Sequence, residues 1–209
     1  MIKKEKIEKR LVRSFFTVSS ITAIAAVVGL IAIVVICLRY SYALHNFGFA
    51  QGDIGTSMFQ FADLRSSLRG AIGYDEQSAI DAVTQQHTEM KATFEQSFQQ
   101  IEKTIVSEDG RKTYDAIEAE LDDYWKLDSE ILALGATTDR ELCKQAQDLA
   151  MSELSVKYNS IYEKLEELLD VKVKEGNKLS GYLMAACWIL VGIIIITIAV
   201  AMMASMKIG

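Results

Sequence analysis

Residues 15–38 read FFTVSSITAIAAVVGLIAIVVICL, a run of 24 residues without a charged side chain. A helix rises about 1.5 Å per residue, so this run spans about 36 Å, whereas the hydrocarbon core of a bilayer is about 30 Å thick. A second uncharged run of 24 residues, 183–206, stands near the other end of the 209-residue chain. A single run of this kind is compatible with a buried core helix, but two at opposite ends favour the membrane. We expect transmembrane helices at 15–38 and 181–206.

The first run differs from a cleaved signal peptide in its length and in its end. The apolar region of a signal peptide has about 7–15 residues and precedes a cleavage site made of small residues. Here the run is longer and ends in Cys37-Leu38-Arg39-Tyr40. We therefore interpret it as a retained helix.

The distribution of charge predicts the orientation of the two helices. Residues 1–13 carry six Lys/Arg and two Asp/Glu, a net charge of +4, whereas residues 39–178 carry 15 Lys/Arg and 26 Asp/Glu, a net charge of −11. Basic segments beside a span stay in the cytoplasm. We expect a basic cytoplasmic tail at 1–14, an acidic domain outside the plasma or inner membrane at 39–180, and a cytoplasmic stub at 207–209.

The segment between the spans has the pattern of an all-α domain. The chain contains no proline, which would interrupt long helices. Turn-forming residues occur at 70–75, 107–110 and 135–139, and they divide the segment into four helices at about 40–73, 76–106, 111–134 and 138–180. Short connections make neighbouring helices antiparallel. We predict an up-down-up-down four-helix bundle whose first and last helices run without a break into the spans.

Apolar rows with steps of three and four support the bundle, because a 3.5-residue repeat is the seam of helices packed at shallow angles. The row predicted for the first helix is Tyr40, Leu44, Phe47, Gln51, Ile54, Met58, Phe61, Arg65, Leu68 and Ile72. The row predicted for the fourth helix is Met151, Leu154, Tyr158, Ile161, Leu165 and Leu168. We interpret His87, in the row of the second helix, as a hydrogen-bonded core histidine rather than a ligand.

The sequence carries no pattern typical of catalysis, metal binding or a cofactor. Of its three cysteines two fall within the predicted spans, so they form no disulfide framework. The two histidines lie outside any Glu-x-x-His or haem-attachment pattern, and no phosphate loop is present. The net charge of −6 argues against a nucleic-acid partner. We expect no enzyme, no metal and no cofactor.

The stretches YALHNFGFAQGDIG (42–55), FADLR (61–65) and AIGY (71–74) resemble the first sensory helix of bacterial methyl-accepting chemotaxis proteins. The layout of span, four antiparallel helices and span resembles the same family over essentially the whole chain. The resemblance implies a homodimer that senses a small molecule, directly or through a solute-binding protein. The family continues into a HAMP linker and a cytoplasmic signalling hairpin, whereas this sequence stops at Gly209; a fragment and a receptor without output both fit.

The resemblance also indicates where a ligand would bind. In this family, arginines on the distal part of the first helix bind ligand carboxylates, partly across the dimer interface, and Arg65 and Arg69 stand in that part here. The planar fork of a guanidinium binds a carboxylate through two hydrogen bonds. Counting from the turns places Arg65 level with Asp128 and Gln145, so Gln145 joins the predicted site. The alternative is a structural role without a ligand, in which Arg65 either pairs with Asp128 or is exposed to solvent.

Three functions remain open at this point. The favoured one is the sensory and transmembrane part of a chemoreceptor, in which a ligand shifts the fourth helix relative to the first. The second is the sensor of a membrane histidine kinase or cyclic-dinucleotide enzyme. The third is a structural membrane protein. Gly48, Gly52 and Gly55 on the first helix suggest a close approach between two protomers, although such spacing is common.

Overall fold

The computed structural model describes residues 2–206, and within this range it leaves out the side chains of residues 2–7, Arg10 and 204–206. The predicted stub 207–209 lies outside the described residues. The chain divides into two compact units: Leu44–Gly176 is one, and Met1–Ala43 together with Asn177–Gly209 is the other. We describe each unit by itself.

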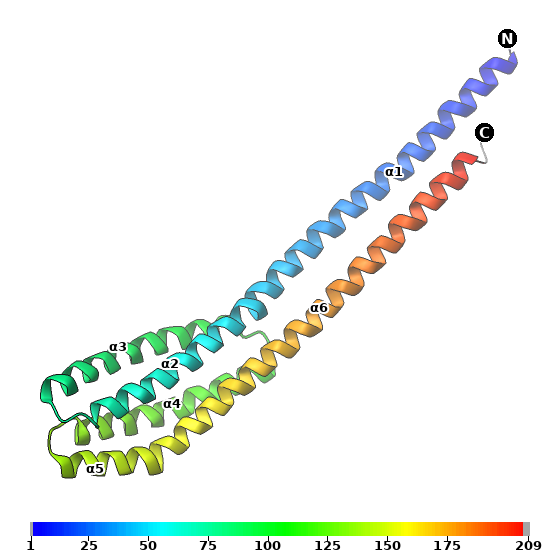
Figure 1. Cartoon of the computed structure of the whole chain (residues 1–209). Helices are drawn as coiled ribbons and strands as arrows, with labels where there is room; N and C mark the ends of the chain where they lie inside the picture. Colours follow the sequence, from blue (N-terminus) through cyan, green and yellow to red (C-terminus); the bar gives the residue numbers. More distant parts are fainter. Residues whose placement is uncertain (1, 207–209) are drawn as a thin grey trace. The chain divides into compact units, whose positions relative to one another are not determined.

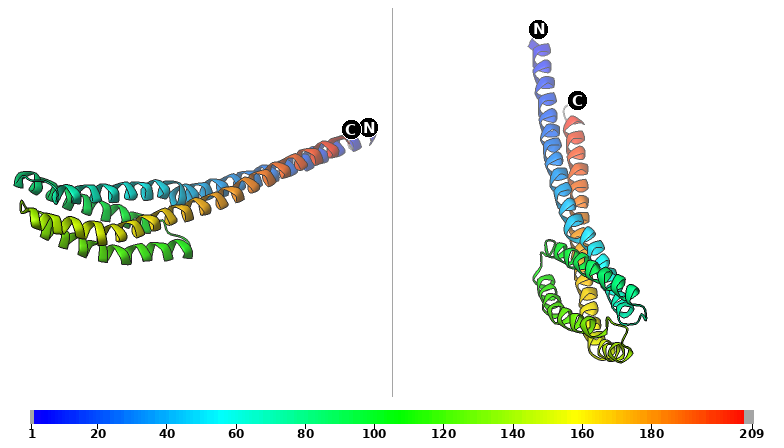
Figure 2. Two further views of the ribbon diagram at one scale, coloured as in Figure 1. Left: turned by 60° about the horizontal axis from the view of Figure 1, so that its bottom comes forward. Right: turned by 90° about the vertical axis from the view of Figure 1, so that its left-hand side faces the viewer.

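The unit Leu44–Gly176 is a bundle of four antiparallel helical rods (Figures 1 and 2). The first rod consists of η1 (Leu44–Phe49) and α2 (Ala50–Ala71), the second is α3 (Gln77–Glu102) and the third is α4 (Glu108–Gly135). The fourth consists of α5 (Arg140–Leu149), η2 (Ala150–Leu154) and the part of α6 (Ser155–Met206) that precedes Asn177. The described residues contain no strand, and the predicted all-α four-helix bundle is confirmed.

Capping residues set the start of two rods. Ser107 precedes α4 in an extended conformation, and its hydroxyl accepts the backbone N–H of Gly110 at 3.0 Å. Asp139 precedes α5 and accepts the N–H groups of Glu141 and Leu142. The third helix therefore begins at Glu108 rather than at residue 111 as predicted. Residues 107–110 are not a turn, because Ser107 is an N-cap and Gly110 lies in the first helical turn.

Gly135 permits a close approach between the third and fourth rods. A Cβ atom at this position would lie 2.3 Å from the Cβ of Ala146 and 2.9 Å from the Cγ2 of Ile72. Any side chain larger than hydrogen would push the end of α4 away from α5. Gly135, the last residue of α4, therefore permits the close packing at the bundle end that carries the loops 72–76 and 136–139, which we call the loop end.

The core row of the first rod differs in phase from the prediction. Phe47, Ile54, Phe61 and Leu68 are buried as expected. The residues that alternate with them in the core are Ala50, Ser57, Leu64 and Ala71. The predicted alternates Gln51, Met58 and Arg65 lie one residue later and are only partly buried. The prediction was wrong at 51 and 58 because Ala50 and Ser57 carry little hydrophobic signal, and at 65 because the row passed over the buried Leu64; the last predicted member, Ile72, is buried as expected.

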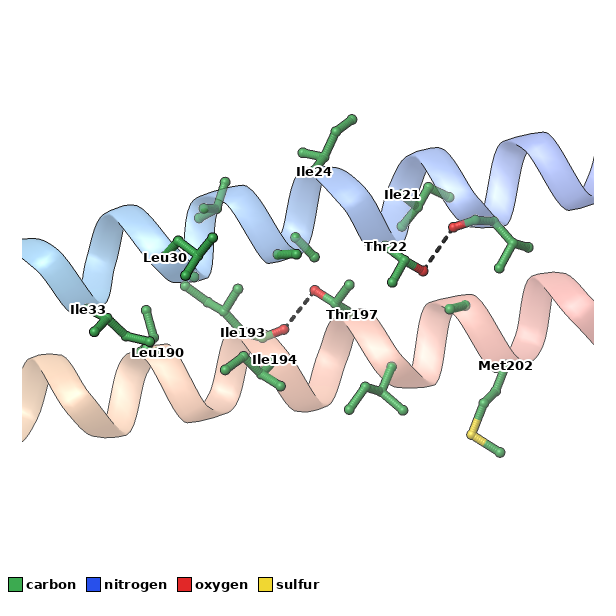
Figure 3. Close-up of a pocket in the computed structure, with 17 residues that line it drawn as sticks. Ile21, Thr22, Ile24, Leu30, Ile33, Leu190, Ile193, Ile194, Thr197 and Met202 are labelled. Carbon is green, nitrogen blue, oxygen red and sulfur yellow. Dashed lines mark hydrogen bonds between the residues drawn. The ribbon is translucent and has the colours of Figure 1, made fainter.

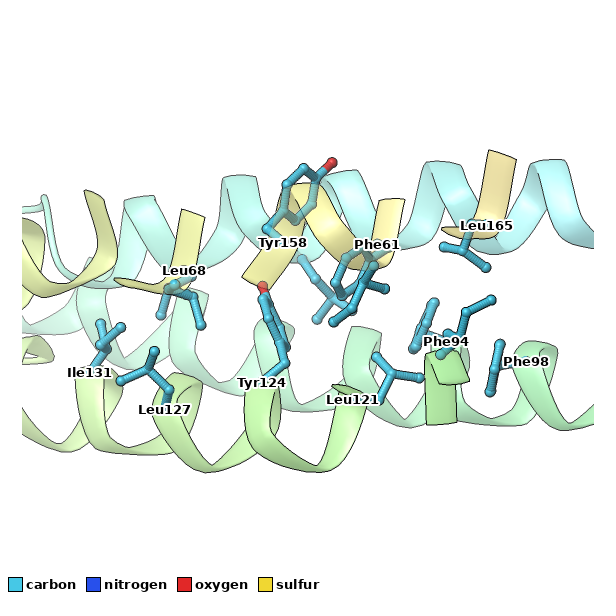
Figure 4. Close-up of a cluster of buried hydrophobic side chains, with 14 of the residues drawn as sticks. Phe61, Leu68, Phe94, Phe98, Leu121, Tyr124, Leu127, Ile131, Tyr158 and Leu165 are labelled. Atoms are coloured by element: carbon cyan, nitrogen blue, oxygen red, sulfur yellow. The ribbon is translucent and has the colours of Figure 1, made fainter. Parts of the chain in front are cut away.

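Aromatic rings fill the middle of the bundle (Figure 4). Phe61 on α2 contacts Phe94 on α3, Tyr124 on α4 and Tyr158 on α6, with ring centres 5.2, 4.9 and 4.9 Å apart. Aromatic pairs at such distances add to the free energy gained from burying their area. One side chain on the first helix thus joins all four rods.

The predicted row of the fourth helix is confirmed in five of its six positions. Leu154, Tyr158, Ile161, Leu165 and Leu168 are buried, whereas Met151 is 74% exposed. Met151 lies inside the π-helix η2, where the wider turn changes which residues face the core. A period of 3.5 residues cannot predict such a local change.

The second unit consists of α1 (Ile2–Ala43) and the part of α6 from Asn177 onward. Both helices are long and apolar enough to cross a membrane, and none of the side chains that the structure describes in either apolar stretch is buried. Side chains of the two helices line an apolar cavity of about 1040 Å³ (Figure 3). Helices with apolar side chains on every face belong in lipid. Helical residues run without a break from Ile2 to Ala71 and from Arg140 to Met206, as predicted.

Candidate functional site

Arg65 lies beside an aromatic ring and not in the predicted ion pair. Its guanidinium carbon is 4.4 Å from the centre of the Tyr158 ring, an arrangement typical of a cation–π contact. Asp128 pairs with His87 instead, at 3.0 Å between Oδ2 and Nε2. The Arg65–Asp128 alternative was wrong because Leu64, and not Arg65, occupies the core position of that turn.

Arg65, Arg69 and Tyr158 form a cationic cluster on α2 and α6. Burial raises the pKa of Tyr158, while the charge of Arg65, a hydrogen bond from Arg65 and the charge of Arg69 act in the opposite direction. Both guanidinium groups therefore lie within electrostatic reach of one phenol. The ring of Tyr158 stacks on Phe61 at an interplanar angle of 9° and on Tyr162 at 25°. This stacking holds the aromatic side of the cluster in place, so that Arg65 rests on a rigid surface.

The members of the cluster differ in access to solvent. Arg65 is partly buried, whereas Arg69 is exposed one turn closer to the loop end. Guanidinium groups donate several hydrogen bonds in a fixed plane and remain charged at every physiological pH. The cluster can therefore bind an anion, with Arg69 as the more accessible donor.

Gln145 is exposed on α5, on a turn whose buried residue is Ala146. The glutamine that reaches the first rod is Gln147, whose Nε2 donates a hydrogen bond to the Ile72 carbonyl at 2.9 Å. Counting residues from the turns is not accurate enough to decide between Gln145 and Gln147, which are two residues apart. Gln145 as a ligand residue stays a prediction.

A buried polar chain joins three rods, and the sequence pattern indicated only its central member, His87. Ser67 on α2 lies 2.7 Å from His87 Nδ1, and His87 Nε2 lies 3.0 Å from Asp128 on α4. His87 and Asp128 are each 1% exposed and Ser67 is 9% exposed. His87 is thus confirmed as a hydrogen-bonded core histidine. Asp128 falls in a heptad row with Leu121, Tyr124 and Ile131. A charged residue in an otherwise apolar row indicates a buried polar contact.

A second buried polar residue, Lys172, extends the core row of α6 beyond Leu168. Its Nζ donates a hydrogen bond to the Thr104 carbonyl after α3, and it lies 5.6 Å from the centre of the Phe47 ring in η1. Burial lowers the pKa of Lys172, and the charge of Glu175 opposes this effect. Lys172 therefore ties the fourth rod to the first rod and to the loop between α3 and α4. The sequence analysis did not identify Lys172, although its position four residues after Leu168 continues the heptad row and indicates a buried side chain.

Comparison with known families matches residues 52–181 to the four helix bundle sensory module for signal transduction. The matched region contains Arg65, Arg69, Tyr158, the buried polar chain and Lys172, and it covers more than half of the chain. The chain belongs to this family. No curated protein and no solved structure matches the sequence.

Membership of this family identifies the chain as a chemoreceptor-type sensor with a membrane association. The cationic cluster on α2 and α6 is then the candidate place for a stimulus to act. Within the residues that the structure describes, no group of three or more His, Cys, Asp or Glu side chains is arranged to hold a metal ion.

Proposed function

We propose that this chain is the sensory and transmembrane module of a chemoreceptor that detects a small anionic solute outside the cell membrane. The observation that carries the proposal is the match to the sensory-module family over residues 52–181, flanked in the chain by two helices apolar enough to cross a membrane. A sensor flanked in this way has its ligand site on one side of a bilayer and its output on the other.

The proposed ligand carries at least one carboxylate or similar anionic group. Arg65 and Arg69 act within reach of the same Tyr158 hydroxyl, and two neighbouring guanidinium groups repel each other. An anion bound between them offsets this repulsion and accepts charge-assisted hydrogen bonds from both. Gln145 would add an amide donor from α5 if the site extends toward the loop end.

The proposed signal travels through α6. Tyr158, which supports Arg65, belongs to the helix that continues to Met206 through the second apolar stretch. An anion that binds more tightly to one arrangement of α2 and α6 than to another shifts the population toward the first. The working unit in this proposal is a homodimer, with both termini in the cytoplasm and the bundle outside.

Ligand binding to three forms of the full chain in detergent micelles tests the proposal. We expect at least one amino acid or small carboxylate to raise the thermal unfolding midpoint of the wild-type bundle. In Arg69→Ala the free energy of ligand binding should weaken by about 1.5–3 kcal/mol, the contribution of one hydrogen bond to a charged group. Unliganded stability should change by less than about 0.5 kcal/mol because Arg69 is exposed.

The matched control is Arg111→Ala. Arg111 is an arginine on α4 that pairs with Glu102 at 2.9 Å, outside the cationic cluster. This variant loses the same charge from the bundle, so it should bind the ligand like wild type. Equal loss of affinity in both variants, or a full panel without any shift of the midpoint, would contradict a site at Arg65 and Arg69.

A further inference from the structure

The hydrogen bonds of the buried polar chain require a definite number of protons. The hydroxyl oxygen of Ser67 lies 2.9 Å from the Leu64 carbonyl and 2.7 Å from His87 Nδ1. A hydroxyl has one hydrogen, and a carbonyl oxygen only accepts. When Ser67 donates to the Leu64 carbonyl, His87 must carry a proton on Nδ1 and donate it to the Ser67 oxygen.

The hydrogen bond at the other nitrogen of His87 determines the number of protons on the pair His87–Asp128. Nε2 lies 3.0 Å from Asp128 Oδ2, so one proton lies between them, either on the nitrogen or on the carboxyl group. With Nδ1 also protonated, the pair holds one proton more than a neutral imidazole beside a carboxylate. Its net charge is then zero, as imidazolium with carboxylate or as imidazole with carboxylic acid.

Removal of that proton gives a second arrangement with different hydrogen bonds. His87 then donates from Nε2 to Asp128, and the Ser67 hydroxyl turns away from the Leu64 carbonyl to donate to Nδ1. The pair now carries a charge of −1, although each side chain is only 2% exposed. An isolated charge is costly to bury. Asp128 Oδ1 has no hydrogen-bond donor among the described residues, so the carboxylate is poorly solvated.

The surroundings of the pair, taken rod by rod, offer little compensation for that charge. On α3 the ammonium group of Lys91, one turn from His87, lies over the Trp125 ring, 4.5 Å from its centre. The first rod contributes Ser67 and Arg65, and the guanidinium of Arg65 lies over the Tyr158 ring. On α4 the pKa of Tyr124 is raised by burial and next by the charge of Asp128, while the charge of Arg65 acts in the opposite direction. The buried residues of the fourth rod's first two elements, α5 and η2, are the apolar Ala146 and Leu154. Tyr158 of α6 acts on the same Tyr124.

We infer that Ser67, His87 and Asp128 form a binding site for one proton, which gives the bundle acidity as a second input beside the cationic cluster. An unperturbed histidine changes its charge between about pH 5 and pH 8, the range in which such an input is useful. When the proton is bound, the Ser67 hydroxyl donates to the Leu64 carbonyl on its own helix, α2. When the proton is released, the hydroxyl donates to His87 Nδ1 on α3. The proton thus selects between two ways of joining the first rod to the second.

The same three residue types occur in hydrolases, but the geometry here does not suit a nucleophile. In a hydrolase triad the serine faces Nε2 and must meet a substrate, while the aspartate holds Nδ1. Here Ser67 faces Nδ1, lies 9% exposed and donates to a main-chain carbonyl. The buried polar chain therefore lacks the exposed nucleophile of a hydrolase triad.

Nitrogen-15 NMR of the full chain in lipid nanodiscs tests the inference directly. The sequence has two histidines, His45 and His87, so His45→Gln leaves His87 as the single source of imidazole signals. In a titration from about pH 5 to about pH 9 we expect two forms of His87, one whose Nδ1 donates a proton to Ser67 and one whose Nδ1 accepts from the Ser67 hydroxyl. A proton count at His87 that stays constant over this range overturns the inference.

Asp128→Asn, added to His45→Gln, is the matched control. The amide can donate to Nε2, so His87 no longer needs the extra proton, and its titration should disappear from this range or move to lower pH. Because Asp128→Asn removes the proposed proton site, the folding constants of the parent and of this variant should depend differently on pH. Identical titration and identical pH dependence in the two proteins would refute a site built on Asp128.

Discussion

At the scale of single residues, the bundle core contains polar side chains at positions that the helical repeat assigns to apolar ones. Lys172 and Asp128 are each 1% exposed, and each lies in a row of buried apolar residues. Both have a partner from another rod: Lys172 donates to the Thr104 carbonyl, and Asp128 meets His87. Such groups add little net stability, because the cost of removing a charge from water offsets the interaction gained. Their effect is to restrict which residues face each other.

Substitutions at Lys172 test this balance. Lys172→Ala should destabilise the bundle by about 2–5 kcal/mol, as for truncation of a buried methionine, because the aliphatic stem leaves a cavity. Lys172→Met keeps the stem without the charge and should lie within about 1.5 kcal/mol of wild type. Chemical denaturation of the full chain in micelles, followed by tyrosine and tryptophan fluorescence, measures both values. If Lys172→Met were as unstable as Lys172→Ala, the result would show that the ammonium group, and not the aliphatic stem, stabilises the bundle.

The pH dependence of this comparison has a definite sign. Burial lowers the pKa of Lys172, so the folded state loses the proton more readily than the unfolded state, whose lysine titrates near about 10.4. The buried ammonium group of Lys172 destabilises the folded state at neutral pH. As the pH rises toward the unfolded value, this group loses its proton and the destabilisation disappears. Wild type should therefore gain stability relative to Lys172→Met between neutral and alkaline pH. A relative loss over the same interval would show that the charged form is the stabilised one.

At the scale of elements, the sequence predicted the number and order of the rods from the turn-forming residues between them, and their antiparallel direction from the short connections. It did not predict the phase of α2, since Ala50 and Ser57 lack an apolar signal, nor the π-helices η1 and η2. A π-turn has no residue signature and arises where tertiary packing requires an extra residue. For the same reason the buried polar chain was only partly predictable, because its contacts join three rods.

The outer face of the first rod carries a second row that predicts how two copies meet. Phe49, Gly52, Thr56 and Phe59 follow steps of three and four and are exposed, with Phe59 67% exposed. A Cβ atom at Gly52 or Gly55 would meet nothing within 4 Å, so these glycines are not required by packing inside one protomer. Exposed aromatic residues beside glycines suit a close contact with the same face of a partner.

Disulfide crosslinking of single cysteines placed along 49–66 tests this face. In a background without the native cysteines, crosslinking should peak at positions 52, 56 and 59 and fall at the buried positions 54, 57 and 61, which gives a 3.5-residue period. Single cysteines on the exposed face of α4, such as position 122, serve as the control and should crosslink weakly. Uniformly low crosslinking along α2 would indicate a monomer or another interface.

At the scale of the whole molecule, the sensor and the membrane helices share continuous helical segments. Helical residues extend from Ile2 to Ala71 and from Arg140 to Met206 without a break, so a stimulus that acts on Arg65 or Tyr158 acts on a segment that includes an apolar run. Such a chain can carry a signal only if the bundle and the termini lie on opposite sides of the bilayer. The charge difference between residues 1–13, at +4, and residues 39–178, at −11, predicts which side each takes.

Labelling with a membrane-impermeant thiol reagent in intact cells tests that orientation. In a background without the native cysteines, Asp109→Cys places a thiol at an exposed position in the first turn of α4, and Glu8→Cys places one in the basic tail. The second change leaves all six Lys/Arg residues of the tail in place, so it keeps the positive signal that holds the tail in the cytoplasm. Position 109 should label in intact cells, and position 8 only after the membrane is permeabilised. Labelling of position 8 in intact cells with protection of position 109 would reverse the topology, and with it the assignment of the cationic cluster to an external stimulus.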